Sequence, residues 1–332
     1  MTSRRELCVI GLGLIGGSVL RAADRAGWTV WGATTSPVDA AAAAGQGCTV
    51  EPDVGSALRR AAADDALVLL AVPFTAVEDV LTSVAQHAPR CRLTDVVGVK
   101  EPVAAAVRRH VVPGTRYVGS HPMAGTSASG WAAGSADLFD GAPWVVSVDG
   151  GGDRAVWADR AVWAEVAGLA LDCGAHVVPA TAAEHDAAAA RVSHLPHLLA
   201  AVLASVGARG GPLALALGAG SFTDGTRVAA SHPELVRAMC EGNRVALVDA
   251  LDDALGQLGA ARAELASTGT VGSTVRAGHL ARRAFDASRG GSDRGSVQVD
   301  LETPGAMERL RELGRLGARV TALHGTRCQV VL

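Results

Sequence analysis

Short apolar runs alternate with alanine-rich stretches through the first half of the chain. The apolar runs predict buried strands, at 7–10, 29–33, 66–72, 91–94, 117–119 and 144–148. The stretches between them, beginning with 14–26, have the length and periodicity of helices. Strands that are apolar throughout and that alternate with helices are typical of a parallel sheet covered on both faces. The pattern therefore predicts an α/β fold for this part of the chain.

The pattern changes to long helical stretches near residue 180 and stays helical to about residue 289. A helix at 155–172 and an apolar run at 176–178 complete the first domain, so we place that domain at 1–179. An all-α helical domain is expected to follow it at 180–290.

Two local signals shape the start of the helical domain. Thr181 and Glu184 have the spacing of a capping box, which predicts that a helix begins there. Pro196 lies inside the same helical pattern and cannot donate a hydrogen bond to the carbonyl of Val192. We therefore expect the helix to be distorted near Ser193.

The last segment, 291–332, follows a glycine-rich linker at 289–293 and has the pattern of a strand, a helix and a strand. Thr303 is expected to cap its helix, with Pro304 in the first helical position. A segment of about 40 residues rarely folds alone, so we expect it to dock on the rest of the protein.

Composition limits the class of protein. The chain has 332 residues, 49% of them hydrophobic, and a net charge of −3, which indicates packed domains and argues against a nucleic-acid surface. No apolar run reaches the length of roughly 18 residues that indicates a membrane-spanning helix. None of the six cysteines forms a C-x-x-C pair, so we expect free thiols in a reducing cytoplasm and no metal site.

A glycine fingerprint opens the chain, with Gly11, Gly13 and Gly16 between the first predicted strand and helix. Gly11 permits the tight turn, Gly13 lets the backbone approach a pyrophosphate, and Gly16 lets helix and strand pack closely. Leu14 and Ile15 begin the helix, whose unpaired N–H groups are expected to face the phosphates. This context predicts a Rossmann-type dinucleotide-binding domain.

The choice between NAD and NADP stays open in the sequence. The second strand of such a domain normally ends near an acidic residue that binds the adenosine ribose. Here the strand is followed by Thr34, Thr35 and Ser36, with neither an acid nor an arginine beside them. The hydroxyl groups of Thr34 and Thr35 can serve either nucleotide.

Further candidates follow the ends of later strands, where the ligands of open parallel sheets bind. Val72 and Pro73 end one strand, and Asp95 and Gly98 lie in the loop after the next. We expect all four to border the cofactor. The alternative for Asp95 is that it caps a helix starting near Val99.

Three kinds of polar residue are candidates for chemistry on a substrate. His121 follows a strand on the expected ligand side and suits proton transfer, although a loop histidine is more often only solvated. Arg227 offers a planar fork for a carboxylate, unless it forms a surface ion pair. His194 and His197 share one helix face, and the sequence around them lacks the carboxylate pattern of a metal site.

Taken together, these motifs resemble the prephenate dehydrogenase family, which includes the arogenate and aminodeoxyprephenate dehydrogenases. The matching segments, in the family's order, are the fingerprint 11–18, Thr94-Asp95 with Lys100, His121-Pro-Met-Ala-Gly-Thr126, Ser193-His-Leu-Pro-His197 and Thr226-Arg-Val-Ala229. The glycine motif is common to many families, whereas the two histidine motifs are specific.

The resemblance implies a cytoplasmic oxidoreductase of tyrosine biosynthesis. Such an enzyme oxidises prephenate, with loss of CO₂, to 4-hydroxyphenylpyruvate and passes a hydride to NAD or NADP. His121 matches the family histidine that accepts the proton of the ring hydroxyl. Arg227 matches the substrate arginine, and we assign it to the side-chain carboxylate, because pairing the carboxylate that leaves would oppose the reaction. Other matching positions near the substrate are Ser193, His197, Thr126 and, reaching from the second subunit of a homodimer, Asp224.

Three features depart from the family pattern. Gly98 stands where the family usually has a serine, and Val236 stands where it often has a tryptophan. The tail resembles half of a regulatory ACT-type βαβ module at Pro304-Gly305 and is too short for a complete one.

The open alternatives are an arogenate or 4-amino-4-deoxyprephenate dehydrogenase and a sensor that binds nucleotide without turnover. No lysine follows Lys100, which argues against the related 3-hydroxyacid dehydrogenases.

Overall fold

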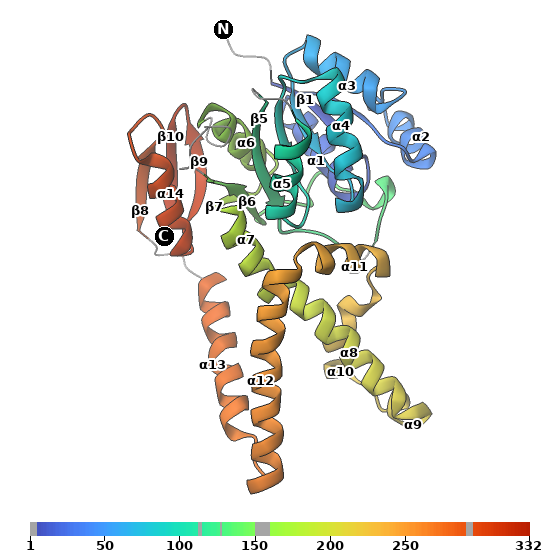
Figure 1. Cartoon of the computed structure of the whole chain (residues 1–332), viewed down its shortest axis with the longest axis vertical. Helices are drawn as coiled ribbons and strands as arrows, with labels where there is room; N and C mark the ends of the chain where they lie inside the picture. The colour runs from blue at the N-terminus through green and yellow to red at the C-terminus, as the bar shows by residue number, and fades with distance from the viewer. Residues whose placement is uncertain (1–4, 112–114, 127, 150–159, 290–294) are drawn as a thin grey trace.

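The computed structural model describes residues 5–111, 115–126, 128–149, 160–289 and 295–332. A ten-stranded sheet forms one end of the molecule, and a group of long helices extends away from it (Figure 1). The strands are β1 (Glu6–Ile10), β2 (Thr29–Ala33), β3 (Leu67–Leu70), β4 (Arg92–Asp95), β5 (Arg116–Pro122), β6 (Pro143–Ser147), β7 (His176–Ala180), β8 (Ser296–Asp300), β9 (Arg319–His324) and β10 (Arg327–Val331). Most of the predicted linker, and the first residues of the helix predicted from 155, lie outside the described residues.

Helices surround the sheet and form the second domain. Those packed beside the sheet are α1 (Leu14–Arg25), α2 (Pro37–Gly45), α3 (Val54–Ala63), η1 (Phe74–Ala76), α4 (Val77–His87), α5 (Glu101–His110), η2 (Trp131–Ala133), α6 (Arg160–Asp172) and α14 (Ala306–Arg315). Those of the second domain are α7 (Ala182–Ala189), η3 (Ala190–His194), α8 (Leu195–Arg209), α9 (Gly211–Ala216), α10 (Gly220–Thr226), η4 (Arg227–Ala230), α11 (Pro233–Gly242), α12 (Arg244–Thr268) and α13 (Gly272–Arg289).

The first five strands form the parallel half of the sheet, in the order β2, β1, β3, β4, β5. Beyond β2 a single parallel bridge joins Gly32 to Val50. With that bridge taken as the next strand, the order is the usual one of a Rossmann domain, and the connections reverse direction between β1 and β3. The crevice at the carboxyl ends of these two strands is where such sheets bind ligands.

The sheet becomes mixed after β5, which departs from the wholly parallel sheet that the sequence predicts. β6 pairs antiparallel with β5, and β7 pairs parallel with β6. In the described residues, the connection from β5 to β6 contains only the one-turn helix η2. A parallel neighbour requires a long crossover, usually a helix, whereas an antiparallel neighbour does not. This connection, residues 123–142, has no long crossover helix in its described part, and β6 returns in the opposite direction.

The C-terminal segment docks on the sheet, as predicted, and extends it. β9 lies beside β7, and β10 and β8 follow, so the segment has one strand more than the sequence pattern predicts. α14 lies so close to β7 that a Cβ atom on Gly314 would stand 1.8 Å from the carbonyl oxygen of Pro179. Arg311 and Arg315 of α14 form ion pairs with Glu184 of α7. The tail is therefore bound to both the sheet and the first helix of the second domain.

The start of α14 differs from its prediction. The helix begins at Ala306 rather than at Pro304, and its cap residue is Gly305, with φ of 80°, rather than Thr303. This left-handed conformation favours glycine, because any side chain there would be strained. The carbonyl of Thr303 accepts the N–H of Ala306 at 3.1 Å, so the turn is closed by backbone groups.

Apolar cores lie on both faces of the sheet. One core includes residues of α1, α6 and α14 together with Trp131 and Trp144. The other includes residues of α3, α4 and α5 together with Trp31. The helical domain has only a small core, around Cys240 and Leu247. Most of the apolar surface of its long helices is therefore not buried within the chain.

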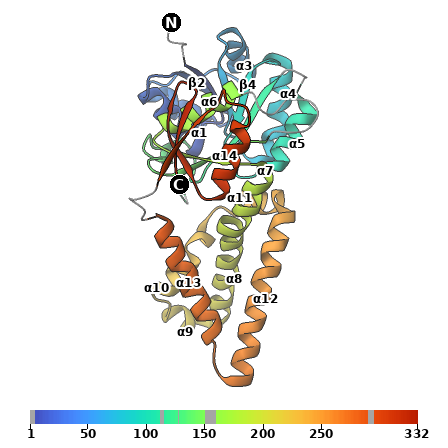
Figure 2. The same cartoon turned by 90° about the vertical axis from the view of Figure 1, so that its left-hand side faces the viewer.

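One continuous helix, α7–η3–α8, connects the two domains. The capping box of Thr181 and Glu184 begins it, as predicted. The wider π-helical turn η3 ends immediately before Leu195 and Pro196, so the distortion expected from the proline takes this form. Figure 2 shows α12 and α13 joined by a turn at the end of the molecule farthest from the sheet.

Large apolar side chains of the helical domain are exposed in the isolated chain. They include Val202, Leu203 and Val206 on α8 and Leu255 and Leu258 on α12. Within the described ranges, the helix 182–209 is the one segment whose length and apolar composition alone would suffice to cross a membrane. The sequence reading finds no such segment, because polar residues interrupt each apolar run. Exposed apolar surface of this extent is typical of a face that contacts another protein chain, a membrane or a ligand.

Candidate active site

The glycine fingerprint lies in the crevice between β1 and β3. Gly11 has φ of 102°, and a Cβ atom on it would stand 2.4 Å from the carbonyl oxygen of Ala71. A Cβ atom on Gly16 would stand 1.9 Å from the carbonyl oxygen of Gly11. Both glycines are therefore required by the packing of α1 on β1 and β3.

Gly13 has a different environment, because no atom of the described residues lies within 4 Å of the position of its missing Cβ. It is the N-cap residue of α1 and, having no side chain, it gives the first N–H groups of the helix no side-chain cap. Leu14 and Ile15 follow as its first, half-buried residues. An open backbone surface beside N–H groups without a side-chain cap is the arrangement that fits a pyrophosphate.

The other predicted cofactor residues border the same crevice. Val72 follows β3, and one of its methyl groups would stand 3.1 Å from a Cβ atom on Gly11. Pro73 is exposed beside it. After β2, the Thr34 hydroxyl accepts the N–H of Ser36 at 3.2 Å, and Thr35 is exposed. The side chain of Thr35 is thus the freer of the two predicted threonines.

Asp95 lies beneath the crevice and is completely buried. Its carboxylate accepts hydrogen bonds from the Lys100 ammonium, from the Tyr117 hydroxyl at 2.6 Å and from the N–H of Val97 at 2.9 Å. Burial lowers the pKa of Lys100 although Asp95 opposes the shift, and burial raises that of Tyr117. Asp95 therefore holds the loop that contains Gly98 and does not present its own carboxylate to the crevice.

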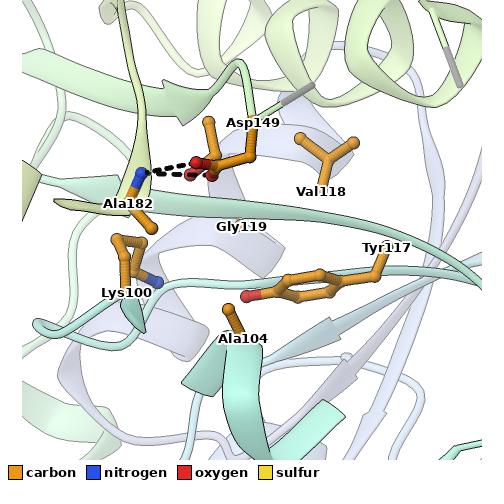
Figure 3. Close-up of a pocket in the computed structure, with 8 residues that line it drawn as sticks. Lys100, Ala104, Tyr117, Val118, Gly119, Asp149 and Ala182 are labelled. Atoms are coloured by element: carbon orange, nitrogen blue, oxygen red, sulfur yellow. Dashed lines mark hydrogen bonds between the residues drawn. The ribbon is translucent and has the colours of Figure 1, made fainter. Parts of the chain in front are cut away.

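Lys100 is held between the sheet and the start of the second domain. Figure 3 shows its side chain beside Tyr117, with Asp149 accepting the N–H of Ala182 at 3.0 and 3.1 Å. The Lys100 ammonium also donates to the carbonyl of Ser120 at 2.7 Å. These residues fix the first turn of α7 relative to the end of β5.

The alternative role predicted for Asp95, as the cap of a helix near Val99, is wrong. The helix is α5, which begins at Glu101, and its first N–H groups are capped by Asp186. The two oxygens of the Asp186 carboxylate accept the N–H of Lys100 at 2.8 Å and that of Glu101 at 2.9 Å. A residue of the helical domain thus caps a helix of the nucleotide-binding domain.

His121 lies near the end of β5 and contacts the helical domain. Its Nδ1 atom is 2.8 Å from Nε2 of His185, and Nδ1 of His185 is 2.7 Å from Oδ1 of Asp186. The two rings meet edge to face, with centroids 5.1 Å apart. Burial, together with His185, Lys100 and His194, lowers the pKa of His121 well below its usual value. The ring is therefore neutral at physiological pH and able to accept a proton.

His185 and Asp186 directly follow the capping box, and the sequence favours a role for them at the start of the helix over a contribution to the polar face of His194 and His197. The structure places both in the site, in contact with His121 and with each other. Both are buried, at 3% and 2% exposure. The sequence did contain one signal for these residues. The polar dipeptide His185-Asp186 directly follows a capping box, at the point where the second domain meets the sheet. Only the fold reveals that His185 faces a histidine 64 positions earlier.

The histidine motif of the second domain divides between two environments. His197 is half-buried, and its Nδ1 donates to the carbonyl of Ser193 at 2.8 Å. His194 is buried, and its Nδ1 lies 3.1 Å from the amide nitrogen of Asn243, which also donates to the carbonyl of Asp186 at 2.7 Å. Burial and the nearby His185 lower the pKa of His194 to about 4.

The remaining predicted residues lie at exposed positions. Thr126 is exposed, and its hydroxyl accepts the N–H of Ala128 at 3.2 Å. Asp224 on α10 and Arg227 on η4 are also exposed, and in the described part of the chain neither side chain has a hydrogen bond or ion pair. η4 packs against α8, the helix that bears His197. Val236 packs in the small core of the helical domain.

The described residues contain no cluster of three or more histidine, cysteine or acidic side chains that could hold a metal ion. The six cysteines are free thiols.

Two family models match the chain. The model for Prephenate dehydrogenase, nucleotide-binding domain matches residues 19–177, and the model for Prephenate dehydrogenase, dimerization domain matches residues 181–271. Fold and site together define a dinucleotide-binding oxidoreductase with a helical dimerisation domain.

Individual relatives agree with the family models. A cyclohexadienyl dehydrogenase from Zymomonas mobilis is 32% identical over 279 residues, which are 80% of this chain and 90% of that protein. A prephenate dehydrogenase from Bacillus subtilis is 29% identical over 74% of this chain and 66% of its own. A crystal structure from Corynebacterium glutamicum, provisionally assigned as a prephenate dehydrogenase, has a TM-score of 0.87 at 45% identity and covers 95% of this chain and 98% of its own. This chain belongs to the prephenate dehydrogenase family.

Proposed function

We propose that this protein oxidises prephenate to 4-hydroxyphenylpyruvate, with loss of CO₂, in the biosynthesis of tyrosine. The observation that carries the proposal is the position of His121. A histidine whose pKa is lowered, and whose Nδ1 is held by a second histidine, lies at the carboxyl end of a Rossmann strand. This is the edge of the sheet where a cofactor and its substrate meet.

The dinucleotide is assigned to the crevice between β1 and β3. Gly11, Gly13 and Gly16 would hold its pyrophosphate against the first turn of α1, with Val72 and Pro73 on the opposite side. The loop at Gly98 would border its nicotinamide. When bound, the oxidised nicotinamide accepts the hydride that leaves the ring carbon of the substrate. Thr34 and Thr35 leave NAD and NADP as equal choices, because no acid at this position repels a 2′-phosphate.

We assign to His121 the role of general base. As the hydride leaves, the ring hydroxyl of the substrate becomes a carbonyl and must lose its proton. His121 accepts that proton, and a neutral imidazole is the form able to do so. Loss of CO₂ then makes the ring aromatic, which renders the reaction irreversible.

We assign to Arg227 the side-chain carboxylate of the substrate. A bidentate pair there positions the substrate, whereas the ring carboxylate has to stay unpaired in order to leave. Ser193, His197 and Thr126 are assigned to the remaining polar groups of the substrate. These residues come from both domains, so the substrate would contact both.

We further propose a homodimer formed through the helical domain. The support is the match to a dimerisation domain together with the apolar side chains exposed on α8 and α12. In such a dimer, Asp224 of one subunit would reach the pocket of the other. Domain limits at 1–179, 180–290 and 291–332 fit this arrangement, with the last segment bound to the edge of the sheet. Six free thiols favour a reducing cytoplasm as the location.

The test is the formation of reduced cofactor by the purified protein with prephenate or arogenate and with NAD or NADP. Turnover with prephenate supports the proposal, and the rates in the four combinations rank the substrates and cofactors. Turnover with arogenate alone would replace prephenate as the substrate. If none of the four combinations gives turnover while cofactor binding is intact, 4-amino-4-deoxyprephenate is the next substrate to test. If that also gives no turnover, the result would favour a sensor that binds nucleotide without catalysis.

A further inference from the structure

We propose that His185 and Asp186 are positioning residues that fix the tautomer of His121, so that Nε2 of His121 is its basic atom. The inference rests on the proposed function, because it assigns an orientation to the base of that reaction. It also explains how this chain orients the base with glycine at position 98.

Asp186 is the last residue in the series of contacts from His121 through His185, and it determines the direction of each hydrogen bond in that series. The Asp186 carboxylate can only accept, so Nδ1 of His185 is the donor across their 2.7 Å contact. In a neutral His185, Nε2 then has no hydrogen and is an acceptor. Nδ1 of His121 must therefore donate across the 2.8 Å contact between the rings. This leaves Nε2 of His121 without a hydrogen and with a free lone pair.

The Cε1–Nε2 edge of the His121 ring faces Gly98, in the loop that borders the crevice. A Cβ atom on Gly98 would stand 3.7 Å from both Nε2 and Cε1 of His121. This edge includes Nε2, whereas His185 contacts the other ring nitrogen, Nδ1. The tautomer set by His185 thus presents the basic nitrogen to the side where nicotinamide and substrate are assigned.

Asp186 is held in place by several hydrogen bonds and can anchor the His121–His185–Asp186 series. It accepts the N–H groups of Lys100 and Glu101 at the start of α5, and its own carbonyl accepts the amide of Asn243. Burial alone would raise its pKa, but the hydrogen bonds from His185 and from these two N–H groups lower it. The carboxylate therefore stays ionised and restricts the rotation of the His185 ring.

The same arrangement stabilises the protonated base. When the O–H bond of the substrate breaks, the new bond is formed at Nε2 of His121, and the hydrogen on Nδ1 stays shared with His185. The positive charge is then connected through His185 to the negative charge of Asp186. The buried ammonium of Lys100 disfavours a positive charge on His121. The His185–Asp186 pair offsets this repulsion by placing a carboxylate within reach of the protonated ring through His185.

The first test reads the tautomer directly and needs no substrate. Long-range ¹H–¹⁵N correlation spectra of protein labelled in its ten histidines distinguish Nδ1–H from Nε2–H rings. The His121→Asn variant identifies the signals of His121 by their loss. We expect His121 to be a neutral ring with its hydrogen on Nδ1. A hydrogen on Nε2 in the native protein would overturn the proposal, whatever the substrate proves to be.

The second test is a matched pair of variants at position 185. In His185→Gln, the side-chain oxygen can take the place of Nε2 and still accept from His121. In His185→Asn, the shorter side chain can take the place of Nδ1 and reach Asp186, but it leaves His121 without a partner. We expect kcat to fall by less than about tenfold in the Gln variant and by about 10² or more in the Asn variant. The Nδ1–H form of His121 should persist only in the Gln variant.

Two controls separate positioning from general damage. Both variants should keep the cofactor affinity of the native protein, because His185 is not part of the glycine cradle. Their thermal midpoints should also be close to one another. Equal losses of kcat in the two variants, with His121 unchanged in its spectra, would assign His185 a purely structural role and refute the proposal. Turnover failure in the native protein would leave the spectroscopic test intact and count only against the proposed function.

Discussion

Gly98 leaves the edge of His121 open: a Cβ atom at position 98 would stand 3.7 Å from Nε2 of the ring, which is ordinary van der Waals contact. A small side chain therefore fits there without displacing the histidine. Because His185 already holds the ring through Nδ1, a hydroxyl at position 98 is not needed to orient it.

Gly98→Ser should change kcat by less than about threefold, which corresponds to about 0.6 kcal/mol of transition-state stabilisation. Steady-state rates with the preferred cofactor measure it. Gly98→Val is the matched control, because a branched side chain would crowd the ring and should reduce kcat further. A rise of tenfold or more in Gly98→Ser would mean that His121 is poorly oriented in the native chain.

His121→Asn should lower kcat by at least about 10², because the general base is lost while the shape of the site is nearly kept. Cofactor affinity, measured by fluorescence titration, should change little. A rate close to that of the native protein would exclude His121 as the base.

Arg227→Ala should act mainly on KM. Losing a charged hydrogen-bonded pair removes roughly 1.5–3 kcal/mol of substrate binding, a factor of about 10–150. Arg282→Ala is a suitable control, since Arg282 is an exposed arginine of α13 that pairs with Asp286. If KM is the same in both variants, the substrate carboxylate binds elsewhere.

Alanine substitutions at Gly13 and Gly16 should separate binding from folding. In the described part of the chain no atom lies near the missing Cβ of Gly13, so Gly13→Ala should fold normally and lose affinity for the dinucleotide. The same atom at Gly16 would overlap the carbonyl of Gly11, so Gly16→Ala should lose about 1–3 kcal/mol of stability as well. Calorimetry and cofactor titration together measure both effects. Unchanged cofactor affinity in Gly13→Ala would place the pyrophosphate elsewhere.

Acid should destabilise the fold through His194. Its pKa is about 4 in the folded chain and about 6.5 when unfolded, so the unfolded state binds more protons between these values. The free energy of unfolding should therefore fall as the pH drops from about 6.5 to about 4, by at most about 3 kcal/mol for this group. Urea unfolding across this range should show a shallower dependence in His194→Gln. Identical slopes in both proteins would contradict the assignment.

Much of the fold was predictable because its elements have clear sequence periods. The strand at 29–33 and the helix from Leu14 have nearly the predicted limits, and the capping box at Thr181 begins α7. The tail was misread because the stretch from Arg319 to Val331 has the pattern of one strand. Gly325, with φ of 62°, turns it into the hairpin of β9 and β10.

The site was predictable only where a motif contains the chemistry. His121 and the three glycines stand in recognisable local patterns. The partners of His121 do not, because the pairing with His185 arises where β5 of the first domain meets α7 of the second. Likewise, Asp95 looked like a ligand or a cap, and its burial under Lys100 and Tyr117 depends on neighbouring strands. Contacts across domains follow from packing and have no signature in the spacing of residues.

Lys100 is the one lysine of the chain, and its ammonium is 1% exposed. An amine-reactive reagent therefore finds a single side-chain target, which it reaches only when the loop before α5 separates from Asp95 and from the start of α7. The rate at which the Lys100 amine is labelled would therefore measure how often the region around His121 opens. Each molecule has one such side chain, so no engineered probe is needed. Bound cofactor or substrate that closes the site would slow the labelling. Lys100 can therefore serve as a native probe of local opening at the active site.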